Sequence, residues 1–169
     1  MNEPAVIIRD KDPELNTLED QTIAVLGYGN QGRAQALNLR DSGLKVIVGN
    51  QADSYRDRAL QDNFHVMDIQ EAVSAARIIF LLLPDEIVQN IYARQIKPFL
   101  QKNVTLVFAS GYNVAFDQIP LPDEADILLI APRMIGVGVR KVAPTFFLRF
   151  LPTCDTPCHP LPLRSLRLL

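Results

Sequence analysis

The chain has 169 residues, of which 48% are hydrophobic and 21% charged, with a net charge of -2 and a pI of about 5.7. This length predicts one globular domain with a full core, and the near-neutral charge gives no support for nucleic-acid binding. No apolar run is long enough for a membrane span, no secretory signal is recognisable, and the two cysteines imply no disulfide framework. We therefore expect a cytoplasmic protein.

Strand and helix signals alternate along the chain after a polar lead-in segment at residues 1–20. Short aliphatic and β-branched runs predict strands at Ile23–Leu26, Lys45–Val48, Phe64–Met67, Ile78–Leu83, Val104–Ala109 and Ile127–Ala131. Between them we expect helices at Gln31–Ser42, Ser54–Gln61, Ile69–Ala76, Asp85–Tyr92 and Ala93–Gln101. The capping-box spacing of Asp68 and Glu71, and Gly43 at a helix end, agree with these boundaries.

Several predicted strands, most clearly Ile78–Leu83, show no polar alternation. This pattern is typical of a parallel sheet that helices cover on both faces. We therefore predict an α/β fold over residues 21–144, a doubly wound parallel sheet (Rossmann fold) of about six strands in the order 3-2-1-4-5-6.

Gly27, Gly29 and Gly32 form a Gly-x-Gly-x-x-Gly motif between the first strand and the first helix. Gly27 permits the tight turn, Gly29 lets the backbone approach phosphates, and Gly32 lets the helix pack on the strand. The helix N-terminus adds free N–H groups and a partial positive charge. Because a strand precedes the motif and a helix follows it, the motif predicts dinucleotide binding.

The segment after the second strand should discriminate NADP from NAD. No acidic residue stands at the strand end itself. Ser54 and Arg56 favour the 2′-phosphate of NADP, whereas Asp53 would repel it. Asp53 or Ser54 could also serve only as the cap of the next helix. The residues favour NADP, with NAD as the alternative.

Polar or flexible residues also follow the fourth, fifth and sixth strands, at Leu83–Glu86, Phe108–Asn113 and Ala131–Gly136. Any one of these segments could be an ordinary turn, but their repetition at successive strand ends indicates one shared crevice. His65 lies in a strand far from this crevice, and we expect it to be structural.

The composition changes after about Arg140. Residues 145–169 contain four prolines and lack glycine, lysine and glutamate. We expect an irregular tail, which is either a frameshifted reading frame or a native irregular segment. Cys154, Cys158 and His159 supply at most three soft ligands there, so we predict no metal site.

From about Asp10 to Arg140 the chain resembles the N-terminal domain of ketol-acid reductoisomerase. The segments that carry this resemblance are Ile23–Gly43, Leu82–Glu86, Phe108–Asn113 and Ile130–Arg133. The family makes precursors of branched-chain amino acids such as isoleucine and valine. Its reaction is an alkyl shift in a 2-hydroxy-2-methyl-3-keto acid followed by reduction with NADPH, and it needs two magnesium ions held by a helical C-terminal domain.

The resemblance implies roles for residues of this chain. Tyr28, Asn30 and Gln31 would join the three glycines at the pyrophosphate, and Ser54 beside Asp53 would lie in the loop for the 2′-phosphate. The further cofactor positions are Asp85, Glu86, Ile87, Val88 and Gly136.

The chain also departs from the family pattern. Gln51 stands where the family usually has arginine or lysine, and Met134–Gly136 replaces a Pro-Gly pattern. Ser110 stands at the position of the family's histidine beside the nicotinamide, which makes it the candidate catalytic residue by position alone. A hydroxyl cannot donate a proton near neutral pH as imidazole does.

We therefore expect an NAD(P)H-binding domain of a ketol-acid reductoisomerase-like oxidoreductase without the metal-binding domain, inactive in isolation. Magnesium and a small keto-acid substrate would belong to a full-length parent. The alternatives are a non-catalytic nucleotide-binding module or gene remnant, and a domain of another small Rossmann reductase. We expect no nucleic-acid or membrane partner, and apolar helix faces that allow self-association.

Overall fold

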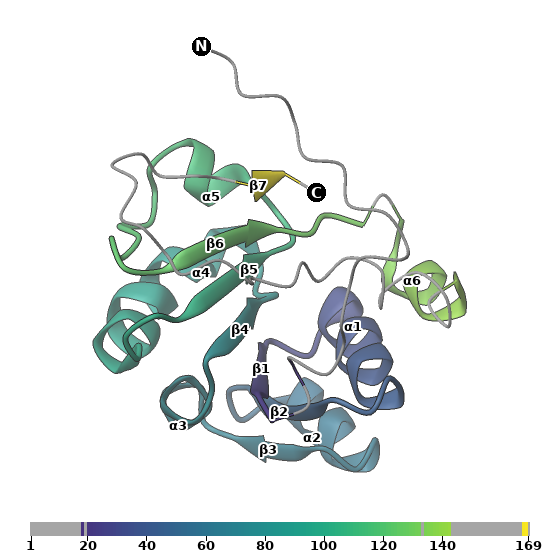
Figure 1. The fold of residues 1–169 in the computed structure, drawn as a ribbon. Coiled ribbons are helices and arrows are strands. Elements are labelled where there is room, and N and C mark those ends of the chain that lie inside the picture. Colours follow the sequence, from purple (N-terminus) through teal and green to yellow (C-terminus); the bar gives the residue numbers. More distant parts are fainter. Residues whose placement is uncertain (1–17, 19, 133, 143–166, 169) are drawn as a thin grey trace.

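An all-parallel, seven-stranded sheet forms the centre of the protein, with helices on both sides (Figure 1). The computed structural model describes residues 18, 20–132, 134–142 and 167–168. The strand order is β3-β2-β1-β4-β5-β6-β7, which confirms the order predicted for six strands. The seventh strand, β7 (Arg167–Leu168), pairs with β6 within the tail that we expected to be irregular. Residues 145–166, with the two cysteines and His159, lie outside the described part.

The strands are β1 (Thr22–Leu26), β2 (Lys45–Gly49), β3 (His65–Met67), β4 (Ile78–Leu81), β5 (Thr105–Phe108) and β6 (Asp126–Leu129). The helices are α1 (Asn30–Asp41), α2 (Ser54–Gln61), α3 (Ile69–Ala75), α4 (Asp85–Ile91), α5 (Tyr112–Ala115) and α6 (Gly136–Val142). β4 is two residues shorter than predicted. The prediction did not include α5 and α6.

The prediction of a separate helix at Ala93–Gln101 is wrong. α4 continues without a break into a π-helical turn, η2 (Tyr92–Ile96), and a 3-10 turn, η3 (Lys97–Phe99). The fully buried side chains of Tyr92 and Ile96 hold this continuation against the sheet. The Tyr92 hydroxyl donates to Pro120 O at 3.2 Å, and burial raises the pKa of Tyr92 to about 12.

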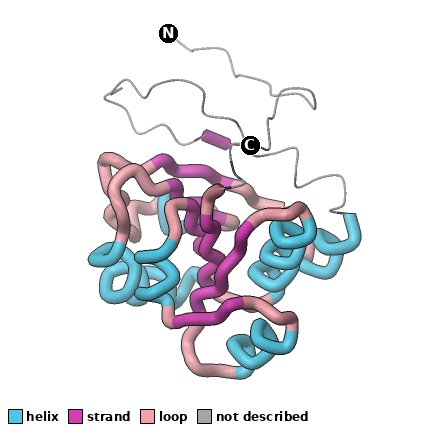
Figure 2. Tube along the Cα trace, turned by 60° about the horizontal axis from the view of Figure 1, so that its bottom comes forward, coloured by secondary structure: helices cyan, strands magenta, loops and turns pink. Residues whose placement is uncertain are grey.

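Apolar side chains on the two faces of the sheet form two separate core clusters. Ile23 and Val25 of β1 pack with α1 and α2, whereas Ala24 and Leu26 face α3 and α4. All four are fully buried, because successive strand residues point to opposite faces and both faces are covered. Figure 2 shows helices on both sides of the central strands.

Two predicted helix boundaries are confirmed. The Asp68–Glu71 capping box precedes α3, with the Asp68 N–H donating to Glu71 Oε2 at 3.2 Å. Gly43 follows α1 in the left-handed region (φ +85°), and its N–H donates to Arg40 O at 2.9 Å.

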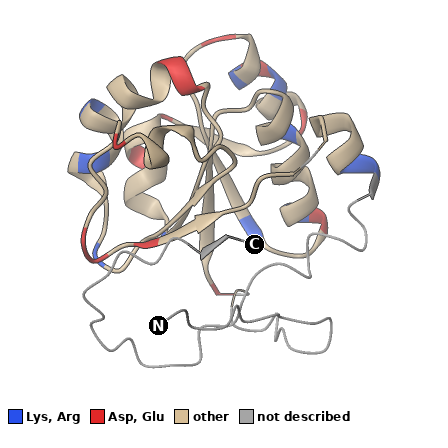
Figure 3. Ribbon diagram, turned by 90° about the horizontal axis from the view of Figure 1, so that it is seen from above, with Lys and Arg blue, Asp and Glu red and all other residues tan. Residues whose placement is uncertain are grey.

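Charged residues of both signs are interspersed on the helices and loops around the sheet (Figure 3). No large field of one sign covers the described residues in this view. Within the same residues, no helix has the length and apolarity needed to cross a membrane.

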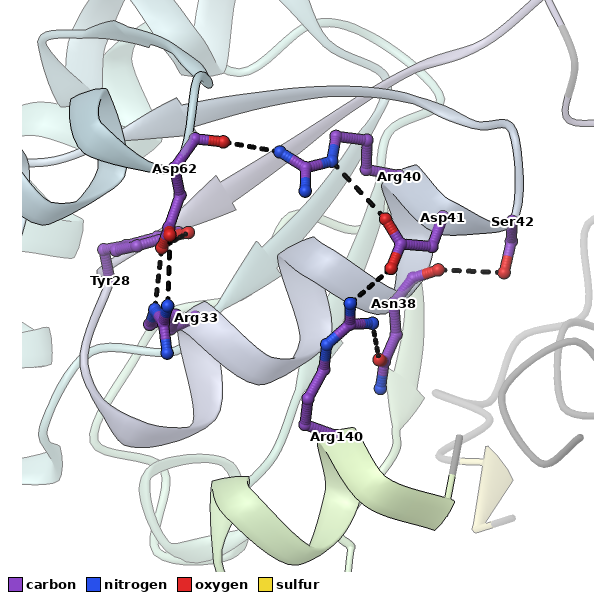
Figure 4. A network of polar contacts seen from close by, with 8 residues as sticks. All are labelled: Tyr28, Arg33, Asn38, Arg40, Asp41, Ser42, Asp62 and Arg140. Atoms are coloured by element: carbon purple, nitrogen blue, oxygen red, sulfur yellow. Dashed lines mark hydrogen bonds and ion pairs between the residues drawn. The ribbon is translucent and has the colours of Figure 1, made fainter. Parts of the chain in front are cut away.

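A polar network ties the end of α2 to α1 (Figure 4). Asp62 accepts hydrogen bonds from Tyr28 Oη at 2.9 Å and from Arg33 Nε and Nη2 at 2.7 and 3.0 Å. The hydrogen bond from Arg33 is the main reason why the pKa of Asp62 lies below its usual value. Burial, followed by the bond to Asp62, raises the pKa of Tyr28.

We expect Asp62→Asn to lower the free energy of unfolding by about 1–2 kcal/mol at pH 7, because three hydrogen bonds to a carboxylate are weakened. A carboxyl group whose pKa is lowered by folding stabilises the folded state above its unfolded pKa of about 4, and this contribution disappears as the pH falls through the folded pKa. The difference between wild type and variant should therefore shrink between pH 5 and pH 3 in urea unfolding. Asp123→Asn, in an exposed turn, is the control and should leave stability unchanged. An undiminished difference at pH 3 would contradict the assignment.

Candidate functional site

The loop between β1 and α1 lies at the carboxyl edge of the sheet. The N–H of Gly27 donates to Gly49 O at 3.0 Å, which joins this loop to the end of β2. Gly27 has φ +89°, and a Cβ there would lie 2.8 Å from Leu82 O. Only glycine therefore suits this turn, in agreement with the role predicted for it.

The N-terminus of α1 is uncapped, and the space beside Gly29 is open. Gly29 is the N-cap residue and has no side chain to cap the helix. The first N–H bonded within the helix is that of Arg33, which donates to Gly29 O at 2.9 Å, so the three preceding amides have no partner inside the helix. A Cβ built on Gly29 would meet no atom within 4 Å. An anion would find uncapped amides and unobstructed room here, so the loop fits a diphosphate.

Gly32 allows α1 to pack closely on the turn that follows β1. A Cβ on Gly32 would lie 2.0 Å from Gly27 O, closer than any real contact. The third glycine of the motif thus has a packing role, as its position predicted.

Tyr28 contributes to the loop through its backbone, while its side chain points into the protein. The ring is buried and packs edge-on against Phe64, with 5.6 Å between centroids. Its N–H donates to Asn50 Oδ1 at 3.2 Å. The Tyr28 side chain is therefore part of the core, and its main-chain N–H joins the glycine loop to Asn50.

Hydrogen bonds within residues 50–56 hold the segment that joins β2 to α2. Asp53 caps α2, because its Oδ1 accepts from Tyr55 N and Arg56 N at 2.8 and 3.0 Å. The cap role left open for Asp53 in the sequence is thus the one its side chain performs. Ser54 begins α2 and is exposed. Arg56 Nη1 donates to Asn50 O at 2.9 Å and to Asp68 Oδ1 at 2.7 Å.

A hollow of about 220 Å³ lies where β4 and β5 end, next to the first turn of α1. It is lined by Gln31, Leu81, Leu82, Leu83, Pro84, Asp85, Val88, Phe108, Ala109, Ser110 and Asn113. A second hollow of about 230 Å³ lies at the amino ends of β5 and β6, far from the glycine loop. The first hollow is the candidate site, because ligands of such folds bind at the carboxyl ends of the strands.

Three polar side chains meet at the rim of this hollow. Ser110 Oγ donates to Asp85 Oδ2 at 3.0 Å, and Asn113 Nδ2 donates to Asp85 Oδ1 at 3.0 Å. Ser110 Oγ also accepts from Tyr112 N at 3.3 Å. The single hydroxyl proton of Ser110 is therefore directed to a carboxylate, which leaves the serine as an acceptor toward the hollow.

The sequence-predicted positions on α4 and α6 are only partly at this rim. Asp85 and Val88 line the hollow, whereas Glu86 and Ile87 are exposed and do not line it. Gly136 is buried, and a Cβ there would lie 1.9 Å from Asn30 O. Glycine at the start of α6 therefore allows α6 to pack closely against the first turn of α1.

Two features of the site were missed by sequence reasoning. Asn113, 2% exposed, ends the polar segment predicted after the fifth strand and binds Asp85, but it is not among the predicted site residues. Gln31 Nε2 donates to Met134 O at 2.9 Å, so the segment before α6 borders the glycine loop. The signal for Asn113 was its place just after a strand end, whereas no pattern indicated the Gln31 contact.

Among the described residues, no group of three or more His, Cys, Asp and Glu side chains could hold a metal ion. No described side chain is therefore assigned to a metal.

Comparison with known proteins gives one family. Residues 17–145 match the family model described as acetohydroxy acid isomeroreductase, NADPH-binding domain. A relative from Saccharolobus solfataricus, named as a ketol-acid reductoisomerase, is 52% identical over 130 residues, which are 76% of this chain and 39% of that protein. The ketol-acid reductoisomerase (NADP(+)) of Methanocaldococcus jannaschii is 45% identical over 136 residues, 80% of this chain and 41% of that protein.

A solved structure gives the same result. The NADH-preferring ketol-acid reductoisomerase from an uncultured archean superposes with a TM-score of 0.79 at 37% identity, over 83% of this chain and 44% of that one. The chain thus spans about two fifths of the length of the curated relatives it matches.

Proposed function

Since the chain belongs to the ketol-acid reductoisomerase family, as an NADPH-binding domain, we propose that the diphosphate of the cofactor binds at its glycine loop and that the nicotinamide end enters the hollow beside Asp85. We further propose that this domain extends over residues 21–144, which the family match at 17–145 supports.

The observation that carries this proposal is the open space over Gly29 in front of the uncapped amides of α1. The main-chain N–H groups of Asn30, Gln31 and Gly32 would bind the phosphate oxygens, and the helix dipole would add to the attraction. Gly27 and Gly32 act indirectly, because they allow the turn and the helix position that bring these amides together.

At the nicotinamide end, Asp85 and Ser110 offer acceptors rather than a proton. When NADPH is bound, its nicotinamide supplies a hydride for reduction of a ketone. Ser110 directs its hydroxyl proton to Asp85, so we propose that it orients a donor group of the cofactor and does not act as an acid. Val88 provides an apolar wall that would keep water from the reacting face.

The activity and substrate of a whole reductoisomerase are part of this proposal. A small keto acid would have to lie against the open side of the hollow, and any magnesium ligands would come from outside the described residues. Exposed apolar side chains near this end, such as Phe116 and Ile135, support self-association of the chain at high concentration.

We expect isothermal titration of the chain to show binding of NADPH and NADH, with NADPH the tighter ligand. Arg56, in the first turn of α2, would attract the 2′-phosphate, and the hydroxyl of Ser54 would donate to it. The glycine loop would bind the part that both cofactors share. Failure of both cofactors to bind would refute the proposed site, whereas equal or reversed affinities would refute only the roles of Arg56 and Ser54.

A further inference from the structure

Arg56 is the cation nearest the end of β2, and its charge already has a partner. Its Nη1 lies 2.7 Å from Asp68 Oδ1 and 2.9 Å from Asn50 O. The Arg56 side chain is 26% exposed, whereas that of Asp68 is 72% exposed. The guanidinium is thus held at the strand end by a main-chain carbonyl and is neutralised from the outside by a carboxylate.

This ion pair stands close to the glycine loop. Gly49 O, at the last residue of β2, accepts from Gly27 N, and Asn50 Oδ1 accepts from Tyr28 N at 3.2 Å. In a doubly wound sheet, the adenosine ribose of a dinucleotide lies at the end of the second strand when the diphosphate lies on the first helix. The 2′ position of the ribose would therefore face the segment that carries Arg56.

The charges around this segment do not suit a dianion. Asp53 and Asp68 are both carboxylates, and Gln51 next to the strand end is neutral. The Asp53 side chain is used by the amides of α2 and by Asn50 Nδ2, which lies 2.8 Å away. A bound 2′-phosphate would have to share Arg56 with Asp68 and would be repelled by the Asp68 carboxylate.

We propose that Asp68 is a specificity-determining residue, which lowers the affinity for the 2′-phosphate by pairing with Arg56 and so narrows the preference for NADPH over NADH. This inference rests on the proposed function, since it assumes that a dinucleotide occupies the glycine loop. It assigns to the residue before α3 a role beyond the capping of that helix.

The test is Asp68→Asn, which removes the charge and retains a residue that caps helices well. Asn50 O still holds the guanidinium at the strand end. We expect the Kd for NADPH to fall about three- to fivefold, as for loss of an exposed ion pair, with the Kd for NADH unchanged. The smaller probes 2′,5′-ADP and 5′-ADP should show the same difference.

Glu71→Gln is the matched control, because it makes the same charge change in the same capping box without a contact to Arg56. The ratio of its affinity for NADPH to its affinity for NADH should remain that of the wild type. In Arg56→Gln, the further change of Asp68 to Asn should change the ratio of the NADPH and NADH affinities less than it does in the wild type, because only the repulsion between Asp68 and the 2′-phosphate is then removed. Asp68→Ser, which also caps without charge, replaces Asp68→Asn if thermal unfolding shows the latter to be unstable.

The cofactor affinities of the wild type and the variants distinguish failure of the proposed binding site from failure of the role of Asp68. If the wild type binds neither cofactor, the proposed function fails and the inference fails with it. If both cofactors bind but Asp68→Asn leaves the ratio unchanged, or Glu71→Gln changes it equally, Asp68 is not a specificity determinant. A rise in the affinity for NADPH relative to NADH that is smaller in the Arg56→Gln background supports the inference.

Discussion

Gly29→Val is expected to abolish binding of NADPH and NADH while the chain remains folded. A Cβ at Gly29 meets no atom within 4 Å, so the fold accommodates the side chain. The valine methyl groups would occupy the space in front of the α1 amides that a diphosphate needs. We expect the affinity to fall at least about 100-fold, which corresponds to about 2.7 kcal/mol. Isothermal titration measures the binding, and circular dichroism checks the fold.

Gly29→Ala provides a graded control for this result. Its single methyl group intrudes less, so its affinity should lie between those of the wild type and Gly29→Val. A Gly29→Val protein that binds NADPH within about threefold of the wild type would place the diphosphate elsewhere.

Gly32→Ala, in contrast, should lower the stability of the fold and not only the affinity for the cofactor. Its Cβ would lie 2.0 Å from Gly27 O and 2.9 Å from Gly27 C, and both of these atoms belong to the backbone. α1 would have to move away from β1, at a cost of about 3 kcal/mol or more in the free energy of unfolding. Urea unfolding followed by circular dichroism measures this change.

The two alanine variants form a matched pair, since each adds one methyl group to a glycine of the same motif. Gly29→Ala should keep the unfolding midpoint of the wild type, whereas Gly32→Ala should shift it strongly. Similar midpoints for the two variants would show that α1 does not pack against Gly27 as described.

Much of the fold follows from patterns that are local in the sequence. The apolar run at Ile78–Leu83 indicated a strand buried on both faces, of which Ile78–Leu81 forms β4. The spacing of Gly27, Gly29 and Gly32 indicated a strand, a tight turn and a closely packed helix. These features depend on neighbouring residues, so a sequence can display them directly. The confirmed strand order follows from the same alternation of strands and helices.

The contacts that define the site join segments that are far apart in the chain. Asp85 meets Ser110 and Asn113 across 25 and 28 residues, and Arg56 meets Asp68 across 12. Periodicity reports which face of a helix or strand is buried, and it does not report which side chain will lie opposite. The sequence therefore indicated that Arg56 could bind a phosphate, but in the structure Arg56 forms an ion pair with Asp68.

The error at η2 has a similar origin. Tyr92 and Ile96 are buried by contact with the sheet, and this packing continues the helix through a π turn where local pattern suggested a break. Tertiary packing here outweighed the signals within the segment.

The close packing of α6 on α1 has a thermodynamic consequence. Gly136 lies over Asn30 O, and Met134 O is bonded to Gln31, so α6 is fastened to the same helical turn whose amides face the empty space. Arg140 extends this seam by its bonds to Asn38 and Asp41. We expect occupation of the loop and retention of α6 to be linked equilibria: if a dinucleotide binds more tightly when α6 is in place, it disfavours detachment of α6, and detachment of α6 in turn lowers the affinity for the dinucleotide by the same factor.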